Sequence, residues 1–562
     1  MKLKKTLAIV LAALLVLGLP LGVLADIWDI SNGSVTVEAK EDGQWVSQNE
    51  TTKQDDAPTI TGTTTDNTLT IKADAGQTAD VTLSDLDINV WNEDEDWHTG
   101  NTKAGISTEG EGNVTITVNG ENQISGGNGH AGVEKQNEGN LTITGSENDS
   151  LTANGGIGGA GIGGGLAYIP DPDSDLDLDE LEKEILEFEK GDNITISGGN
   201  ITANGGAYGG AGIGGASDIG GSGTNIKITG GNVIAVGGNA GAGIGGGMHG
   251  DAKDILITGG TVNASSSGGG AGIGSGQGGD ASNITISGGN VTADGTSDMG
   301  TGGAGIGSGS ESMKSEKNCD ASNITISGGT VNATGGAWAA GIGGGGGNGS
   351  NITISGGDVT ATGGAGGAGI GGGFQHAGSN ITISGDADVK IISREGGGAY
   401  IGDGAQWPNG VLEKGKEVAP NIARLSPNGS IKFYSPGADP DKDEPIKTIV
   451  GTFVPPAGAP DTRYYLTDEN ETALSSRANV TDGVMTVNTE ESTVKCYVTR
   501  EGLQKMASEG ITVFRVVTPQ GSFEVTIADL LAKTGESFCF VISDGAAVLL
   551  MDGSQDVSEL LH

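Results

Sequence analysis

Two tryptophans and a run of acids form the segment of this chain whose residue types best suit ligand binding. Residues 91–98 read Trp-Asn-Glu-Asp-Glu-Asp-Trp-His and directly follow a strand-like stretch that ends at Val90. Indole rings stack on the apolar faces of sugars, and clustered carboxylates coordinate calcium through oxygen. The alternative is a solvated loop whose indoles cover the edge of the fold. The predicted ligand-binding residues are Trp91, Glu93, Asp94, Asp96 and Trp97, and the predicted metal ligands beside them are Asp85 and Asp87.

A second acidic segment has the spacing of a calcium-binding loop. Five of its acids fall at positions 1, 3, 5, 9 and 12 of the EF-hand pattern. They are Asp171, Asp173, Asp175, Asp179 and Glu182. Leu176 occupies the position where the pattern requires glycine, so the alternative is the acidic first turn of a helix, which the helix dipole favours. Calcium is the cofactor that these two segments suggest.

The rest of the chain is dominated by a repeat, which must position these segments. The phrase Asn-Ile-Thr-Ile-Ser-Gly-Gly recurs, with small changes, from residues 193, 225, 254, 283, 323, 351 and 380. A second phrase, Ala-Gly-Ile-Gly-Gly-Gly or a variant, has its Ile at 162, 213, 244, 273, 306, 342 and 370. Four of the six steps between the first set of starts are 28 or 29 residues long. Such a period is typical of a solenoid, so the repeat decides the fold.

One repeat predicts three short strands with glycine corners. In residues 323–343, Asn-Ile-Thr-Ile-Ser and Thr-Val-Asn-Ala alternate apolar and polar residues, and Ala-Gly-Ile-Gly supplies a third strand. Glycine at this density opposes a helix. The predicted fold class is therefore all-β, a right-handed parallel β-helix of about ten three-strand coils. The Ile residues of successive repeats would stack into inward columns and form a long, thin core that no single coil could bury.

The chain is expected to contain five regions. They are a signal peptide over residues 1–25, cap strands over 26–57, the β-helix over 58–434, a linker over 435–460 and a small α+β domain over 461–562. Insertions at 168–192 and 310–319 interrupt the coils, and the first is predicted to form an acidic helix. The last domain is predicted to contain helices at 500–508 and 527–533, and its Cys496 and Cys539 are expected to form either a disulfide or two buried thiols.

The first residues and the charge both favour an exterior location. Lys2, Lys4 and Lys5 precede an apolar stretch and a small-residue cleavage site, which is the pattern of a secretory signal. The net charge is −42, and without those three lysines 26 basic residues face 71 acids, which gives −45. Such a surface repels nucleic acid and anionic membranes. We therefore expect a secreted protein, either free or associated with the cell surface, with no membrane span after signal removal and no nucleic-acid partner.

A family resemblance is carried by three stretches of the early coils. They are Ala79–Ile88, Lys103–Ile106 and Asn113–Gly120, which read Ala-Asp-Val-Thr-Leu-Ser-Asp-Leu-Asp-Ile, Lys-Ala-Gly-Ile and Asn-Val-Thr-Ile-Thr-Val-Asn-Gly. This pattern resembles the opening coils of secreted clostridial carbohydrate-binding β-helix proteins, over about residues 58–160. The resemblance implies binding of polygalacturonate or cellulose-type glycans together with calcium. Trp338, Phe374 and Tyr208, with Tyr400, suggest a further aromatic surface, although they could equally fill gaps left by glycine.

Catalysis is the first competing function, because many pectin-cleaving enzymes are parallel β-helices. A pectin lyase needs a strong base near its substrate, yet the first arginine of this chain is Arg394. A pectin hydrolase of this fold uses clustered Asp with His, and Gly129-His130-Ala131 is only a faint echo of that His motif. His249 and His376 are predicted to lie several coils apart. The sequence therefore favours a protein without enzymatic activity.

A surface adhesin or structural stalk is the second competing function, since it needs only length, solubility and protease resistance. Taken together, the sequence favours a secreted, non-catalytic protein that binds an extracellular polysaccharide or a cell-surface glycan with the help of calcium. The adhesin or stalk is the alternative, and a pectin-degrading lyase or hydrolase is the lesser one.

Overall fold

The computed structural model describes most of the chain in two compact units, one comprising residues 1–280 and 312–315 and the other 281–311 and 316–562. The described ranges are 26–91, 102–166, 191–217, 221–296, 302–312, 318–394, 397–408, 411–422, 425–426, 428–450, 463–468, 473–474, 477–535, 537–543, 545–551 and 555–561. The predicted signal peptide and nearly all of the predicted acidic insertion lie outside these ranges. Gly191 and Asp192, placed at the end of that insertion by the sequence, instead begin strand β15 (Gly191–Ile196).

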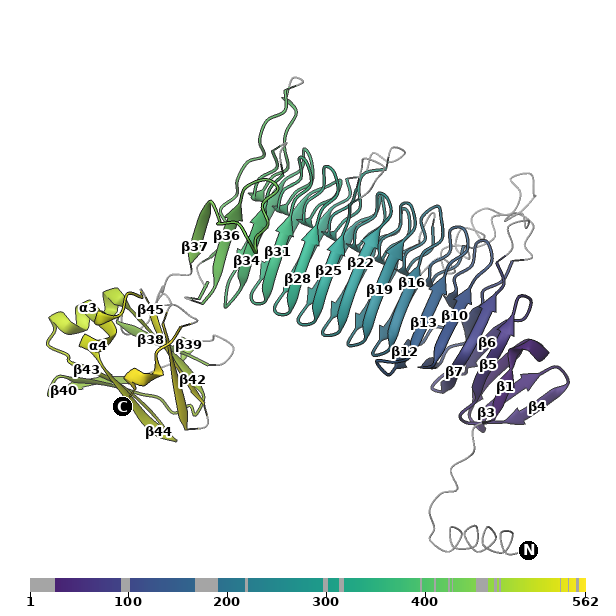
Figure 1. The fold of residues 1–562 in the computed structure, drawn as a ribbon, viewed down its shortest axis with the longest axis horizontal. Helices are drawn as coiled ribbons and strands as arrows, with labels where there is room; N and C mark the ends of the chain where they lie inside the picture. Colours follow the sequence, from purple (N-terminus) through teal and green to yellow (C-terminus); the bar gives the residue numbers. More distant parts are fainter. Residues whose placement is uncertain are drawn as a thin grey trace, which may run out of the picture. The chain divides into compact units, whose positions relative to one another are not determined.

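A single coil shows how the repeat folds. It consists of β27 (Ala321–Ile326), β28 (Thr330–Thr334) and β29 (Ile342–Gly343) (Figure 1). Ile324 and Ile326 are buried, and Thr325 between them is partly exposed, as expected for a strand with one face on the core. This coil confirms the prediction of three short strands joined by glycine-rich corners.

Successive coils of the second unit stack in register. Ile324 pairs with Ile284 on one side and Ile352 on the other, and all of these strands run parallel. The predicted Ile columns are therefore confirmed there. The other coil strands of this unit are β24 (Ala281–Ile286), β30 (Gly349–Ile354), β33 (Gly378–Ile383), β25 (Asn290–Asp294), β31 (Asp358–Thr362), β34 (Asp388–Ile392), β36 (Ser430–Tyr434), β26 (Ile306–Gly307), β32 (Ile370–Gly371) and β35 (Ile401–Gly402).

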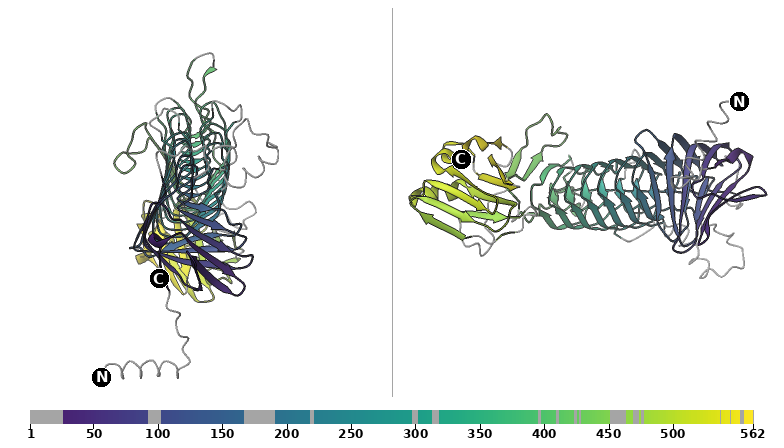
Figure 2. Two further views of the ribbon diagram at one scale, coloured as in Figure 1. Left: turned by 90° about the vertical axis from the view of Figure 1, so that its right-hand side faces the viewer. Right: turned by 90° about the horizontal axis from the view of Figure 1, so that it is seen from below.

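The first unit contains coils of the same kind. Figure 2 shows strands of successive coils lying over one another, and Ile194 pairs with Ile226 as predicted. The coil strands are β5 (Thr59–Thr64), β6 (Leu69–Ala73), β7 (Thr78–Asn89), β8 (Ile106–Glu109), β9 (Asn113–Asn119), β10 (Glu121–Ser125), β11 (Val133–Lys135), β12 (Leu141–Gly145), β13 (Ser150–Asn154), β14 (Ile162–Gly163), β15, β16 (Asn200–Asn204), β17 (Ile213–Gly214), β18 (Gly223–Ile228), β19 (Asn232–Gly237), β20 (Ile244–Gly245), β21 (Ala252–Ile257), β22 (Thr261–Ser266) and β23 (Ile273–Gly274).

The asparagine that opens each repeat has a structural role. In the second unit Asn283, Asn323, Asn351 and Asn380 all have φ near +55°. The side-chain amides of Asn323, Asn351 and Asn380 each donate to the side-chain oxygen of the asparagine one coil before, at 3.1 to 3.2 Å. Asparagine tolerates the left-handed conformation better than other residues with a side chain. The ladder therefore explains why this position is asparagine.

Parallel pairing begins earlier than the predicted boundary at residue 58. Strand β1 (Ile27–Asp29) pairs in parallel with β5, and β2 (Val35–Lys40) pairs in parallel with β6. Strands β3 (Gly43–Gln48) and β4 (Thr51–Gln54) then extend the edge in antiparallel fashion. The buried Trp28 indole donates to Asp55 at 2.9 Å and fixes this end.

The residues after the coils first add one strand to the coil sheet and then form two sheets of their own. Strand β37 (Lys447–Val450) pairs antiparallel with β36. Residues 464–561 form a six-stranded and a four-stranded sheet around their own apolar core. This region contains α3 (Arg500–Ser508) and α4 (Ile527–Ala532), close to the two predicted helices. Its strands are β38 (Tyr464–Thr467), β39 (Ala473–Leu474), β40 (Arg477–Thr481), β41 (Val484–Asn488), β42 (Val494–Thr499), β43 (Val513–Thr518), β44 (Gly521–Thr526), β45 (Ser537–Ser543), β46 (Ala546–Met551) and β47 (Gln555–Asp556).

Cys496 on β42 and Cys539 on β45 are both buried in this core. They lie diagonally across neighbouring strands, because Cys496 pairs with Phe540 and Cys539 with Tyr497. Burial raises the pKa of the Cys496 thiol well above its usual value, and the nearby Cys539 raises it further. Cys496 is therefore a buried, protonated thiol, in line with the second of the two sequence expectations.

Candidate functional site

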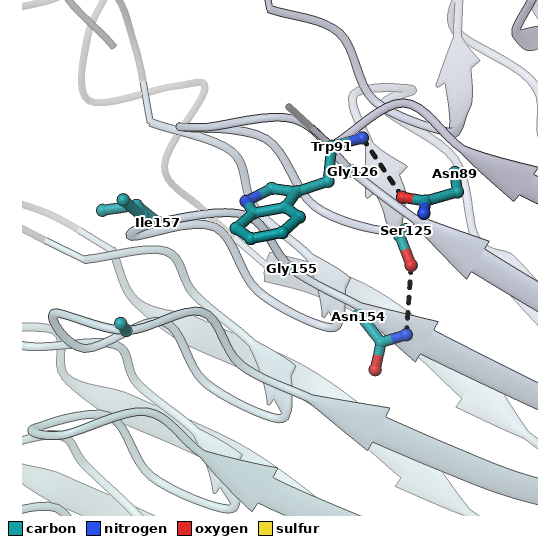
Figure 3. A pocket seen from close by; sticks show the side chains of 8 residues that line it. Asn89, Trp91, Ser125, Gly126, Asn154, Gly155 and Ile157 are labelled. Carbon is teal, nitrogen blue, oxygen red and sulfur yellow. Dashed lines mark hydrogen bonds between the residues drawn. The ribbon is translucent and has the colours of Figure 1, made fainter. Parts of the chain in front are cut away.

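A pocket of about 320 Å³ opens beside Trp91 in the first unit (Figure 3). The Trp91 side chain is 43% exposed, so one part of the indole is available to a ligand. Its backbone N–H donates to the side-chain oxygen of Asn89 at 3.3 Å. The other lining residues are Ser125, Gly126, Asn154, Gly155, Ile157 and Ala207.

The coil repeat positions these residues at one corner. Strands β7, β10 and β13 end at Asn89, Ser125 and Asn154, and the parallel register aligns these three positions. The Asn154 amide donates to the Ser125 hydroxyl at 3.2 Å, as Figure 3 shows. Glycine follows directly in two of the coils, at positions 126 and 155, where a Cβ atom would lie 2.3 Å from the carbonyl oxygens of Ala131 and Gly159.

The pocket chemistry suits a polar, uncharged ligand. Among its described lining residues, the polar side chains are amides and a hydroxyl, and none is ionisable. Such groups donate to and accept from sugar hydroxyls, and the indole supplies the apolar face that stacks on a sugar ring. The lining offers no fixed cation for a carboxylate or phosphate. The arrangement can hold a saccharide more readily than an anion.

The two described metal-ligand candidates have different surroundings. Asp85 lies at an irregularity of β7 with φ +49°, and its carboxylate accepts the backbone N–H of Glu121 at 3.1 Å. This bond ties Asp85 to the turn between β9 and β10. Asp87 is partly exposed and pairs with Thr63 and Gln123 on neighbouring strands. Over the described ranges, no three acids, histidines or cysteines gather in a metal-binding group.

The remaining predicted site residues lie outside the described residues. They are Glu93, Asp94, Asp96 and Trp97 of the first acidic segment and Asp171, Asp173, Asp175, Asp179 and Glu182 of the second. Of the predicted set, the structure therefore places Trp91, Asp85 and Asp87, and only Trp91 lines the pocket.

A buried ionic group near this corner was missed by the sequence reasoning. The side chain of Glu134 is 3% exposed and accepts from His130 Nδ1 at 2.8 Å and from the Ala131 N–H at 3.1 Å. The Lys135 side chain is 1% exposed, and burial lowers its pKa despite Asp192 at 3.8 Å. The sequence did contain a sign of this group, because Val133-Glu134-Lys135 stands at the third-strand position where the next coil has Ile162-Gly163.

His130 is held on both sides. Burial would lower its pKa, but the charge and hydrogen bond of Glu134, with the Thr102 backbone carbonyl, outweigh burial and raise it. Because His130 is bound to both Glu134 and the backbone, we interpret the pair of His130 and Glu134 as a structural ion pair. His249 and His376 make other contacts, with Ser312 at 3.1 Å and Glu311 at 3.0 Å.

The fold and corner geometry define a parallel β-helix repeat protein. Six segments match the family model described as beta helix repeat, at residues 194–217, 226–248, 255–277, 284–310, 324–346 and 352–374. These matches support a parallel β-helix repeat family for the central coils. No curated protein and no solved structure matches the chain. In the part of the chain that the structure describes, no helix has the length and hydrophobicity of a membrane span.

Proposed function

We propose that this protein is a secreted, non-catalytic polysaccharide-binding protein whose ligand contacts the pocket beside Trp91. One observation carries the proposal: a 43% exposed indole lines a pocket whose described polar groups are amides and a hydroxyl. Stacking on the indole and hydrogen bonds to the amides are the two interactions that saccharide recognition needs. The β-helix repeat is compatible with a polysaccharide-related role, although the fold alone does not decide function.

Calcium enters the proposal as an assisting ion. The chain has a net charge of −42, so an acidic polysaccharide would be repelled unless divalent cations bridge the two sets of carboxylates. Among the described candidates, Asp85 is exposed but accepts the backbone N–H of Glu121, and Asp87 is partly exposed. The residues proposed to hold the ion with Asp87 are therefore the acids Glu93, Asp94 and Asp96 that follow Trp91 in the sequence.

The absence of catalysis is also part of the proposal. His130 is the histidine closest in sequence to the pocket-lining Gly126, and it is held by Glu134 and the Thr102 backbone. Proton transfer to a substrate would require it to leave both partners. A structural stalk or adhesin is the second candidate, because the in-register asparagine ladder joins successive coils whether or not a ligand binds.

The test is retention of the purified chain on a panel of neutral and acidic polysaccharides, with calcium and with a chelator. Released sugar is assayed in the same samples. We expect retention without release, and loss of retention on acidic glycans when calcium is removed. No retention on any glycan would favour the stalk or adhesin, and released sugar would show that the protein is an enzyme.

A further inference from the structure

Three aromatic side chains form a continuous row in the second unit. The ring centroids of Trp338 and Phe374 lie 4.5 Å apart, and those of Phe374 and Trp407 lie 6.2 Å apart. Trp407 is 49% exposed, and Trp338 and Phe374 are partly exposed. We call these three residues the aromatic row. The sequence suggested an aromatic surface that included Trp338 and Phe374 but not Trp407. Tyr400, which the sequence added to that surface, packs against Phe433 with ring centroids 5.3 Å apart.

The turns that carry the row are bonded to one another. The Phe374 N–H donates to the Trp338 carbonyl at 2.7 Å, and the neighbouring Gln375 N–H donates to the Ala405 carbonyl at 2.8 Å. Glycine makes the packing possible, since a Cβ atom on Gly366 would lie only 2.7 Å from the Trp338 ring. The row is therefore held by the coil backbone and not by a single loop.

We propose that the aromatic row is a second glycan contact, along which an uncharged stretch of polysaccharide lies. The rings are inclined to one another, at 56° between Trp338 and Phe374 and 83° between Phe374 and Trp407, so each ring contacts the sugar chain at its own angle and the exposed Trp407 indole supplies the stacking face. This inference rests on the proposed function and adds to it a second binding surface with a preferred ligand class. Aromatic faces attract the C–H surfaces of sugar rings, and a half-exposed indole at the end of a row is accessible to them. A polysaccharide is the occupant to which the surface is assigned.

The spacing of the row supports an extended polymer. Successive coils advance by about 4.8 Å, the distance between neighbouring strands. This advance is close to the length that one hexose adds to an extended polysaccharide. An extended polysaccharide that lies along the coils would therefore place about one sugar residue at each successive coil.

The polar groups beside the row favour an uncharged ligand. Gln375 is exposed and Gln406 is partly exposed, so both amides can reach sugar hydroxyls. The ionisable groups nearby include the contact of His376 with Glu311 at 3.0 Å, the pair of Lys414 with Glu417 at 3.0 Å, and the exposed carboxylate of Glu413, whose backbone pairs with Gln406. An anionic sugar would have to disrupt these pairs, whereas a neutral sugar needs no such change.

The test compares Trp407→Ala and Phe374→Leu with Trp45→Ala on the polysaccharide that the wild type retains best, in the presence of calcium. Trp45 is the control, because it is a partly exposed tryptophan on β3 of the first unit that lines neither the pocket nor the aromatic row. We expect Trp407→Ala to raise the Kd about tenfold, which corresponds to about 1.4 kcal/mol. The control is expected to change it less than about twofold, and all variants are expected to keep the wild-type melting temperature within a few degrees.

A second measurement uses soluble neutral oligosaccharides of increasing length. Affinity is expected to rise until the oligosaccharide spans the row, and this rise is expected to disappear in Trp407→Ala. Wild-type retention with unchanged binding by Trp407→Ala and Phe374→Leu would overturn the aromatic row while leaving the proposed function intact. An equal loss in Trp45→Ala would show non-specific adhesion and would also overturn it. Failure of the wild type to bind any glycan would instead remove the proposed function itself.

Discussion

Single residues decide the chemistry of the Trp91 corner. The sequence predicted Trp91 because an indole beside a run of acids suits a sugar ring and a calcium ion. It did not predict Asn89, Ser125 and Asn154 as neighbours, since only the coil register brings these strand ends together. It also missed Glu134, whose burial depends on the neighbouring coil having glycine at position 165, where a Cβ atom would lie 2.2 Å from the carboxylate.

The pair formed by His130 and Glu134 predicts a pH-dependent contribution to stability. Burial would lower the pKa of His130, but Glu134 raises it above the ordinary value. A group whose pKa is raised by folding stabilises the folded state fully below its unfolded pKa, near 6.5, and loses that contribution as pH rises through the folded pKa. Thermal unfolding between about pH 5 and 9 is expected to show this decline in the wild type.

The variant His130→Asn isolates that contribution, because asparagine keeps a hydrogen-bonding side chain but does not titrate. The difference in melting temperature between wild type and variant is expected to shrink as pH rises. A difference that is constant across the pH range would show that folding does not shift the pKa of His130.

The repeat specifies the secondary-structure elements more completely than it specifies the residues of the candidate site. The period of 28 or 29 residues and the alternation in residues 323–334 were enough to predict strands, corners and Ile columns. The asparagine ladder was not predicted, because a left-handed φ cannot be distinguished from an extended one by residue type alone. The parallel strands β1 and β2 were assigned to a cap, since their sequences lack the repeat phrase.

The glycine after the third-strand Ile predicts a strong steric effect. Gly343 has φ +130°, and a Cβ atom there would lie 2.1 Å from the Gly371 carbonyl oxygen. We expect Gly343→Ala to lower the free energy of unfolding by roughly 3 kcal/mol or more, measured by urea denaturation. Gly437→Ala is the matched control, with φ +75° but no atom within 4 Å, and it is expected to show only the backbone cost of about 1–2 kcal/mol. Equal losses would contradict the steric explanation.

The asparagine ladder can be divided into its two contributions. Asn323 donates to Asn283 and accepts from Asn351, each at 3.2 Å, and has φ +56°. Asn323→Gly removes the side-chain bonds but suits the backbone, whereas Asn323→Ala removes the bonds and strains it. In urea denaturation we expect Ala to be less stable than Gly by about 1 kcal/mol. If Ala were as stable as Gly, the left-handed conformation would not constrain this position.

The net charge of −42 is the main property of the molecule as a whole. Like charges repel in the folded state, and salt screens this repulsion over a Debye length that falls from about 30 Å at 0.01 M to about 8 Å at 0.15 M. The melting temperature is therefore expected to rise over this range of sodium chloride concentration. A melting temperature that is independent of salt would show that the acids are dispersed widely enough to interact little.

The net charge indicates which classes of partner the whole molecule disfavours. It does not identify the residues of the binding site. It disfavours nucleic acid and anionic membranes, but it cannot choose between a neutral polysaccharide and an acidic one bridged by calcium. That choice depends on residues such as Asn154 and Asp87, whose neighbours are set by the fold.

The most direct test of polysaccharide binding at Trp91 is the Kd of the wild type and of Trp91→Ala for the best-retained polysaccharide, by titration calorimetry with calcium present. Trp45→Ala is the control, because this indole lies on β3 and donates to Asp42 at 3.2 Å. The account predicts a Kd about tenfold higher for Trp91→Ala, or about 1.4 kcal/mol, with the control close to wild type. Equal affinity of all three proteins, at unchanged melting temperatures, would contradict the assignment of the binding site to this pocket.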